Sequence, residues 1–261
     1  MRKLAIVLGL GEVGKPIFNL LTRAYETTQV RTYDPLTVIN PPTPGEVFDY
    51  MHICFPQTPR FFEYLKEYVI LYEPKCIIIH STLHPGTMMQ LAKQYHEFSI
   101  DSPAIFYSPV RGNIKDGMEW GLKHYTKFFA GAFDYGPKNA AAIVLHLDQA
   151  GIPAKAVDSP KSLEYAKLFN LAYYGSCIAI FQEFERIVEA EDLNYDEIKT
   201  FIFSTEGESG GKVRRSFYYG GHIDGHCVIP ALEKLVAAHD VDLFKDVILS
   251  NIRRERELTL K

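Results

Sequence analysis

Short apolar runs alternate with amphipathic segments over the first 158 residues. The apolar runs predict strands at Leu4–Leu8, Val30–Tyr33, Tyr50–Phe55, Cys76–His80, Ser102–Phe106, Lys127–Ala130 and Ala154–Val157. Helical spacing between them predicts helices at Val13–Tyr25, Pro59–Leu71, Gly86–Glu97 and Pro137–Ala150. Strands that alternate with helices are typical of a parallel doubly wound sheet. We therefore expect an α/β domain over residues 1–158.

The pattern changes after Asp158. Ser159 and Pro160 are typical of a helix start, and helical spacing continues to about Ala190. Further helices are predicted at Tyr195–Phe203, Val228–His239 and Leu243–Glu257, with a long glycine-rich loop at Thr205–Gly225. Because no strand-like run follows, we expect residues 159–261 to form an all-helical domain.

The predicted helix at 160–190 is apolar nearly all round its middle, from Leu168 to Phe181. Such a helix needs cover on more than one side, and a domain of about 100 residues hardly provides it. We therefore expect a homodimer through the 160–190 helix.

The composition narrows the function classes. The chain has 261 residues, 47% of them hydrophobic, which is enough for one large or two modest cores. A net charge of −4 argues against a protein that binds nucleic acid or an anionic membrane, because such proteins carry an excess of positive charge. The longest apolar stretch falls short of the roughly 20 residues that span a bilayer. The four cysteines are widely spaced and match no zinc or redox pattern. With no signal-peptide architecture at the start, we expect a cytoplasmic protein without a metal.

The first strand runs into a glycine-rich turn that is typical of a dinucleotide-binding Rossmann domain. Gly9 allows the tight turn, Gly11 lets the backbone approach a pyrophosphate, and Gly14 lets the following helix pack close to the strand. Asp34 follows the second strand, where a carboxylate hydrogen-bonds the adenosine ribose and repels a 2′-phosphate. The sequence therefore predicts NAD rather than NADP; the alternative is a structural glycine turn in another α/β protein.

Polar residues also follow the later strands, and the carboxyl ends of such strands face the ligand crevice. Pro56, Thr58, Ser81 and Thr82 follow the third and fourth strands. Together with the turn, they complete the predicted cofactor set: Gly9, Leu10, Gly11, Glu12, Val13, Gly14, Asp34, Pro56, Thr58, Ser81 and Thr82.

Taken in order, the motifs resemble the UDP-glucose/GDP-mannose dehydrogenase family. They are the glycine turn, Pro56–Pro59, Ser81–Thr87, Tyr107–Gly112, Glu164–Asn170 and Gly220–Pro230. The resemblance implies a Rossmann domain, a helical dimerisation domain and a C-terminal nucleotide-sugar domain. We expect this chain to be a short member without the last of these.

The resemblance also implies a chemistry: oxidation of an alcohol by hydride transfer to NAD. Cys227 would trap an aldehyde, Lys167 would stabilise negative charge on oxygen, and Thr82 would hold a water or the substrate hydroxyl. The expected substrate contacts are Ser108, Arg111, Asn170 and His226.

Three positions depart from the family pattern. Leu171 stands where the family has asparagine, with Asn170 one residue early, while Val110 and Ala231 replace carboxylates of the acid/base and hydrolytic steps. A single alcohol–carbonyl hydride transfer therefore fits the remaining residues better than the full four-electron oxidation. The substrate would be a sugar, a sugar acid or a similar polyol.

Alternatives stand beside these assignments. Cys227 could be a small buried hydrophobe, Lys167 a surface residue, and Arg111 with Arg214 and Arg215 either an anion clamp or a solvated surface. His222, His226 and Cys227 lack a fourth ligand, which argues against a metal. The protein as a whole could be a non-catalytic NAD-binding family member, or a single-step hydroxyacid dehydrogenase in which Lys167 is the helical-domain lysine.

Overall fold

The computed structural model describes residues 4–26, 29–96, 102–112, 116–133 and 136–260. By compactness the chain divides into two units, Met1–Lys167 and Leu168–Lys261. The division falls inside the long helix α6 (Pro160–Ala190), so the first turns of that helix belong to the first unit.

The first unit contains a sheet of seven strands in the order β2-β1-β3-β4-β5-β6-β7. The strands are β1 (Ala5–Leu8), β2 (Val30–Tyr33), β3 (Tyr50–Ile53), β4 (Cys76–Ile79), β5 (Ala104–Tyr107), β6 (Lys127–Gly131) and β7 (Ala154–Ala156). Every predicted strand is present, and the predicted Rossmann-type α/β class, followed along the chain by a helical region, is confirmed.

One pairing departs from the predicted parallel sheet. β6 runs antiparallel to β5, whereas every other pairing is parallel. The helix α4 (Gly117–His124) before β6 was also not predicted. Its two glycines weaken the helix signal, but Gly121 is required there because a Cβ would lie 2.4 Å from the Arg111 carbonyl oxygen.

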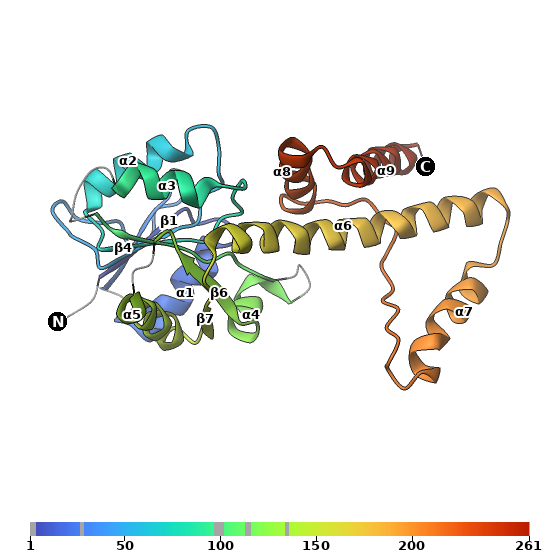
Figure 1. Cartoon of the computed structure of the whole chain (residues 1–261), viewed down its shortest axis with the longest axis horizontal. Coiled ribbons are helices and arrows are strands. Elements are labelled where there is room, and N and C mark those ends of the chain that lie inside the picture. The colour runs from blue at the N-terminus through green and yellow to red at the C-terminus, as the bar shows by residue number, and fades with distance from the viewer. Residues whose placement is uncertain (1–3, 27–28, 97–101, 113–115, 134–135, 261) are drawn as a thin grey trace. The chain divides into compact units, whose positions relative to one another are not determined.

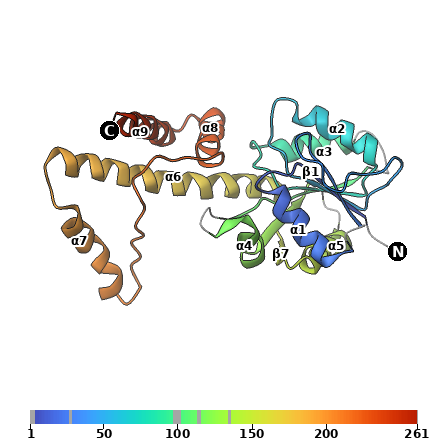
Figure 2. The same ribbon diagram turned by 180° about the vertical axis from the view of Figure 1, so that it is seen from behind.

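Helices cover both faces of this sheet (Figure 1; from behind, Figure 2). One face packs against α1 (Gly14–Ala24), α4 and α5 (Gly136–Gln149), and the other packs against α2 (Phe61–Tyr72) and α3 (Thr87–His96). The predicted end of α3 at Glu97 lies outside the described residues. Successive side chains of a strand point to opposite faces, which is why β1 feeds both cores: Ala5 and Val7 one, Ile6 and Leu8 the other.

The second unit consists of helices. The rest of α6 is followed by α7 (Tyr195–Glu208), α8 (Val228–His239) and α9 (Asp242–Thr259). Arg186 ties α6 to α9 through Glu257 and Ser250, and Phe181 of α6 stacks on Phe203 of α7.

The predicted loop at Thr205–Gly225 is wrong over its first residues, because α7 continues to Glu208. The helix stops where two glycines adopt positive φ, Gly210 at 61° and Gly211 at 78°. A left-handed glycine after the last turn is a common helix end.

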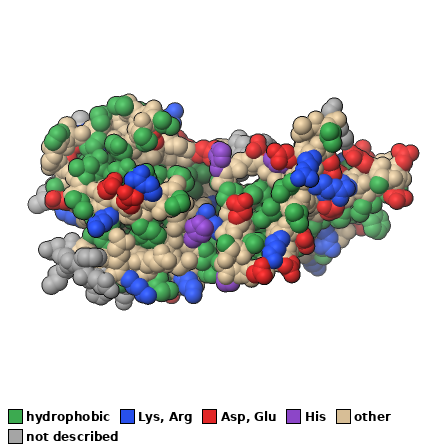
Figure 3. Space-filling view, turned by 90° about the horizontal axis from the view of Figure 1, so that it is seen from above, with side chains coloured by type: hydrophobic (Ala, Val, Ile, Leu, Met, Phe, Trp, Pro, Cys, Tyr) green, Lys and Arg blue, Asp and Glu red, His purple; other side chains and the backbone are tan. Residues whose placement is uncertain are grey.

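Among the residues that the structure describes, no helix is long and apolar enough to cross a membrane. On the face shown in Figure 3, hydrophobic, acidic and basic side chains are intermixed.

Candidate cofactor and substrate site

Apart from Lys167 on α6, the predicted site residues of the first unit lie just beyond the carboxyl ends of five strands. β1 to β5 run parallel, so these ends meet at one edge of the sheet. The strand order reverses at β1, which lies between β2 and β3. Ligands of open α/β sheets bind outside the carboxyl ends at such a reversal. The structure therefore brings the glycine turn, Asp34, Thr58, Thr82 and Ser108 to the expected edge.

The glycine turn after β1 has the geometry that its residues predict. Gly9 has φ of 89°, a conformation that favours glycine, and a Cβ there would lie 3.0 Å from the Phe55 backbone nitrogen. A Cβ on Gly14 would lie 1.7 Å from the Gly9 carbonyl oxygen, so only glycine allows this helix–strand approach. A Cβ on Gly11, which is exposed, would meet nothing within 4 Å. The turn is therefore closed at its ends and open at Gly11.

The rest of the turn leads directly into α1. Leu10 is buried, Glu12 is exposed and Val13 stands at the N-cap of α1 without a side-chain cap. The N–H groups of a first helical turn carry partial positive charge and favour an anion. The open side at Gly11 thus adjoins a helix N-terminus.

Asp34 places its carboxylate at this turn. One oxygen accepts the Leu10 N–H at 2.7 Å and the other accepts the Leu36 N–H at 2.9 Å. The carboxylate is therefore fixed beside the glycine turn, between the ends of β1 and β2, which suits a ribose hydroxyl next to a pyrophosphate.

The loops after β3 and β4 are tied to each other. Ser81 is buried and donates from its hydroxyl to the Phe55 carbonyl at 2.5 Å. Gln57, which sequence reasoning missed, accepts the His84 N–H and donates to the Thr87 hydroxyl. Pro56 and Thr58 are exposed and Thr82 is half-buried, so these three side chains remain at the surface of the strand edge.

The first turns of α6 are anchored to the sheet unit. Glu164 is fully buried and accepts the N–H groups of Gly86 and Met88, each at 2.7 Å. Burial raises the pKa of Glu164, although both N–H groups act in the opposite direction. Three residues on, Lys167 donates to the Val110 carbonyl at 2.9 Å. The structure therefore brings Lys167 to the segment that contains Ser108 and Arg111.

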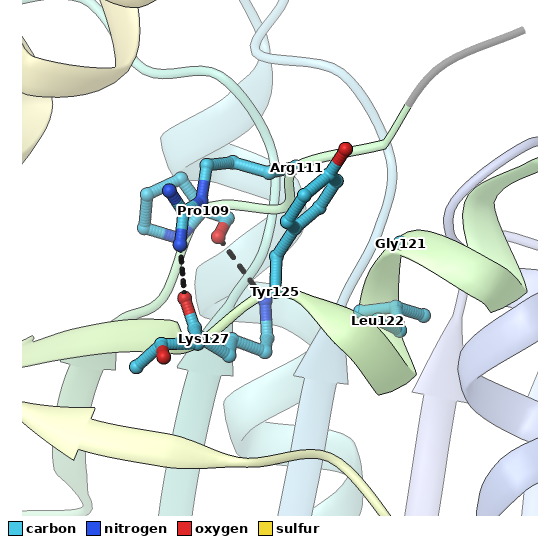
Figure 4. A pocket seen from close by; sticks show the side chains of 7 residues that line it. Pro109, Arg111, Gly121, Leu122, Tyr125 and Lys127 are labelled. Atoms are coloured by element: carbon cyan, nitrogen blue, oxygen red, sulfur yellow. Dashed lines mark hydrogen bonds between the residues drawn. The ribbon is translucent and has the colours of Figure 1, made fainter. Parts of the chain in front are cut away.

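That segment follows β5 and borders a small pocket (Figure 4). Ser108 is buried and donates from its hydroxyl to the Phe128 carbonyl. Arg111 is exposed, donates to the Thr126 carbonyl and lies over the Tyr125 ring at 5.5 Å. Lys127 points into the same pocket and donates to the Pro109 carbonyl.

The other predicted site residues belong to the second unit. Asn170 is exposed on α6, and His226 and Cys227 are exposed directly before α8. Cys227 is the N-cap residue of that helix and has a free thiol, so the alternative of a buried structural cysteine is wrong. The action of Cys227 and Lys167 on one substrate, which the family resemblance implies, stays a prediction.

Several buried polar residues of the first unit were not predicted as functional. His52 on β3, His80 after β4 and His146 on α5 are fully or almost fully buried, and Lys127 on β6 is 4% exposed. The signal in the sequence was weak, because a single histidine or lysine within or beside an apolar run does not show whether its side chain is buried. Over the described part of the chain, no group of three or more His, Cys, Asp or Glu side chains is arranged to hold a metal ion.

Comparison with known proteins yields structural relatives only. No family model matches the chain, and no curated protein matches it by sequence. Among solved structures, the UDP-D-ManNAc dehydrogenase of Pyrococcus horikoshii matches with a TM-score of 0.74 and 16% identity, over 97% of this chain and 68% of that one. The UDP-N-acetyl-mannosamine dehydrogenase of Staphylococcus aureus matches with a TM-score of 0.75 and 15% identity, over 98% and 69%.

A shorter dehydrogenase matches as well. The 3-hydroxyisobutyrate dehydrogenase of Mycobacterium tuberculosis, in a structure with L-serine, has a TM-score of 0.67 and 15% identity, and the match covers 95% of this chain and 91% of that one. At these identities the likeness establishes the fold.

Proposed function

We propose that this protein is an NAD-dependent oxidoreductase that transfers hydride from an alcohol to the cofactor. The observation that carries the proposal is the turn after β1: Gly11 is open, α1 begins beside it, and the Asp34 carboxylate lies 2.7 Å from the Leu10 nitrogen. Pyrophosphate would lie at Gly11 and the helix N-terminus, and the adenosine ribose at Asp34. The dehydrogenases among the structural neighbours support this reading.

The proposal includes a preference for NAD over NADP, because a 2′-phosphate would meet the Asp34 carboxylate as a like charge. Calorimetric titration of the full chain should give tighter binding of NAD than of NADP. Asp34→Ala should weaken NAD binding and reduce the preference. Asp246→Ala, which changes an exposed carboxylate on α9, is the matched control and should alter neither. Tighter binding of NADP by the unmodified protein would refute the preference.

For the chemical step, we propose that Lys167 and Thr82 hold the substrate oxygen. The nicotinamide of bound NAD supplies the hydride acceptor. Lys167 is positioned by the Val110 carbonyl and by the buried Glu164 one turn earlier. A cation held in this way stabilises negative charge that develops on the oxygen as hydride leaves. Cys227 would lie at the same substrate, together with Asn170 and His226.

We further propose that the reaction stops after one hydride. Val110 and Ala231, which stand at family carboxylate positions, are buried apolar side chains and supply no base for hydrolysis of an oxidised intermediate bound to Cys227. The measurement is stoichiometry: incubate candidate sugars, sugar acids and hydroxy acids with NAD and count NADH per product. One NADH is expected. Two NADH per acid formed, abolished by Cys227→Ser, would show that the full oxidation takes place.

Two alternatives have specific support. A single-step hydroxyacid dehydrogenase is supported by the match over 91% of the 3-hydroxyisobutyrate dehydrogenase chain, and oxidation of a short hydroxy acid in the same assay would favour it. A non-catalytic NAD-binding protein is supported by Val110 and Ala231. NAD binding without NADH formation on any candidate alcohol would favour that reading.

We also propose a homodimer through α6. Phe169, Tyr173, Ile180 and Ile187 are each at least half exposed on this helix. A stripe of large apolar side chains this long is typical of a protein–protein interface.

A further inference from the structure

A chain of hydrogen bonds crosses the layer between the sheet and the helices α1 and α5. Tyr25 Oη lies 2.8 Å from His146 Nδ1, and His146 Nε2 lies 2.9 Å from His52 Nε2. His52 Nδ1 in turn lies 2.9 Å from His80 Nε2, and His80 Nδ1 lies 3.1 Å from the Ser108 carbonyl oxygen. We call Tyr25, His146, His52 and His80 the histidine chain. It leads from the Tyr25 hydroxyl to the strand end that carries the candidate substrate residues.

The acceptor at its inner end sets the direction of the chain. A carbonyl can only accept, so His80 carries its proton on Nδ1 and accepts on Nε2. His52 then donates from Nδ1 and His146 donates from Nε2, which makes His146 Nδ1 an acceptor. The Tyr25 hydroxyl lies 2.8 Å from this nitrogen and 2.8 Å from Gln149 Oε1, so the two acceptors share its single proton. Burial keeps these rings neutral: it lowers the pKa of His52 to about 3 and that of His80 well below its usual value, and the nearby Lys127 acts in the same direction.

Lys127 reaches the same carbonyl from β6. Its ammonium nitrogen lies 2.6 Å from the Ser108 oxygen and 3.3 Å from the Pro109 oxygen. Burial lowers the pKa of Lys127 to about 7; Lys167 and Arg111 lower it further, and the Cys54 thiol acts in the opposite direction. Two positive charges on one buried acceptor would repel each other. With the histidine chain neutral, any buried charge here resides on Lys127.

Together, two lysines hold three successive carbonyl groups after β5. Lys127 donates hydrogen bonds to the carbonyl groups of Ser108 and Pro109, and Lys167 donates one to the carbonyl group of Val110. The next residue is Arg111, an exposed cation. The backbone of the candidate substrate segment Ser108–Arg111 is thus fixed from inside the sheet by Lys127 and from α6 by Lys167.

We propose that Lys127 is a positioning residue of the candidate substrate site: it holds the Ser108–Arg111 segment, and its gain or loss of a proton changes the charge offered to an anionic substrate group. The histidine chain is its neutral co-donor on the Ser108 carbonyl. The hold of Lys127 on this segment stands on the hydrogen-bond geometry, and the burial of its side chain is the reason to expect a lowered titration. The effect on a substrate rests on the proposed oxidoreductase function.

Nuclear magnetic resonance of the full chain, with 15N-labelled lysine and histidine, tests the titration. One lysine signal should titrate near pH 7 and should be missing from Lys127→Met. His52 and His80 should carry their protons on Nδ1 and should not titrate between pH 8 and pH 5. Titration of Lys127 together with the exposed lysines, or a neutral His80 protonated on Nε2, would overturn the proposal.

A second variant keeps the test independent of the folding of Lys127→Met. Lys167→Met removes a neighbouring charge, so the Lys127 titration should move to higher pH. Lys66→Met, an exposed lysine on α2, is the control and should leave it in place. An unmoved Lys127 signal in Lys167→Met would contradict the coupling.

Kinetics test the positioning role once an anionic alcohol substrate is in hand. One group that titrates near pH 7 changes its protonated fraction about tenfold between pH 6 and pH 8, so KM should rise about tenfold over that range. KM should be independent of pH in Lys127→Met and low throughout in Lys127→Arg, which stays charged. A pH-independent KM in the unmodified protein would refute the role. If no alcohol is oxidised, the proposed function fails, while the resonance experiment still decides the titration.

Discussion

Single glycines define the candidate cofactor site, and their roles differ. Gly9 and Gly14 are required by the packing of this chain itself, since added Cβ atoms would meet backbone at 3.0 and 1.7 Å. Gly11 meets nothing, so the structure gives no internal reason for glycine there. All three were predicted from the sequence, because a glycine turn between a strand and a helix has few physical interpretations. His52, His80 and Lys127 were not predicted, because burial of a polar side chain depends on neighbours from distant elements.

Gly14→Ala should destabilise the protein. The new Cβ collides with the Gly9 carbonyl, and relief of such a clash costs about 2 kcal/mol or more of unfolding free energy. Gly207→Ala on α7 is the control: its Cβ meets nothing within 4 Å, and alanine favours the helix by up to about 1 kcal/mol. Urea unfolding measures both, and equal stability of Gly14→Ala and the unmodified protein would contradict the packing at the turn.

At the scale of elements, the hydrophobic pattern predicted the strands and most of the helices, but it did not predict the direction of every strand. Short apolar runs and helical spacing identify an element by its own buried side chains, which is why all seven strands were predicted. The antiparallel pairing of β6 depends on how the chain returns after α4, which spacing does not encode. The hydrophobic pattern also does not predict the histidine chain, whose polar side chains are buried in the layer between the sheet and the helices α1 and α5.

This polar chain predicts a pH dependence of stability. The pKa of His52 is about 3 in the folded protein, against about 6.5 in an unfolded chain, and the pKa of His80 is lowered in the same direction. Between these values the unfolded chain binds protons that the folded protein does not. Stability should therefore fall as the pH falls below 6.5, by about 1.4 kcal/mol per pH unit for each histidine.

Urea unfolding between pH 7 and pH 5 measures this dependence. His226→Gln, which changes an exposed histidine, should keep the same slope. Constant stability from pH 6.5 to pH 5 would show that His52 and His80 are not buried as neutral rings.

At the scale of the whole molecule, the sequence predicted an α/β unit followed by helices, and the structure has both. The boundary between its compact units lies within α6, because Glu164 and Lys167 bond to the sheet unit. The change from strand-like to helix-like spacing shows where the element type changes. It does not show which residues the first turns of α6 contact. The apolar pattern of the long helix likewise predicts that another surface covers it, but the pattern does not identify that surface.

We expect the cover to be a second copy. Tyr173, Ile180 and Ile187 are 66%, 50% and 55% exposed on α6. Sedimentation equilibrium should show a dimer at micromolar concentration, and Ile180→Glu should shift it toward monomer because a buried charge is costly. Leu145→Glu, at an exposed apolar residue of α5, is the control and should stay dimeric. A monomeric unmodified protein would refute the dimer.

The most direct test of NAD binding at the glycine turn is the affinity of Gly11→Ala for NAD, measured by calorimetry beside its thermal stability. Because a Cβ at Gly11 meets nothing within 4 Å, the melting temperature should stay that of the unmodified protein. The same Cβ would occupy the space where the pyrophosphate approaches the backbone, so NAD affinity should fall by about tenfold or more, the equivalent of about 1.4 kcal/mol. Unchanged stability with unchanged NAD affinity, or no NAD binding by the unmodified protein, would contradict a cofactor site at this turn.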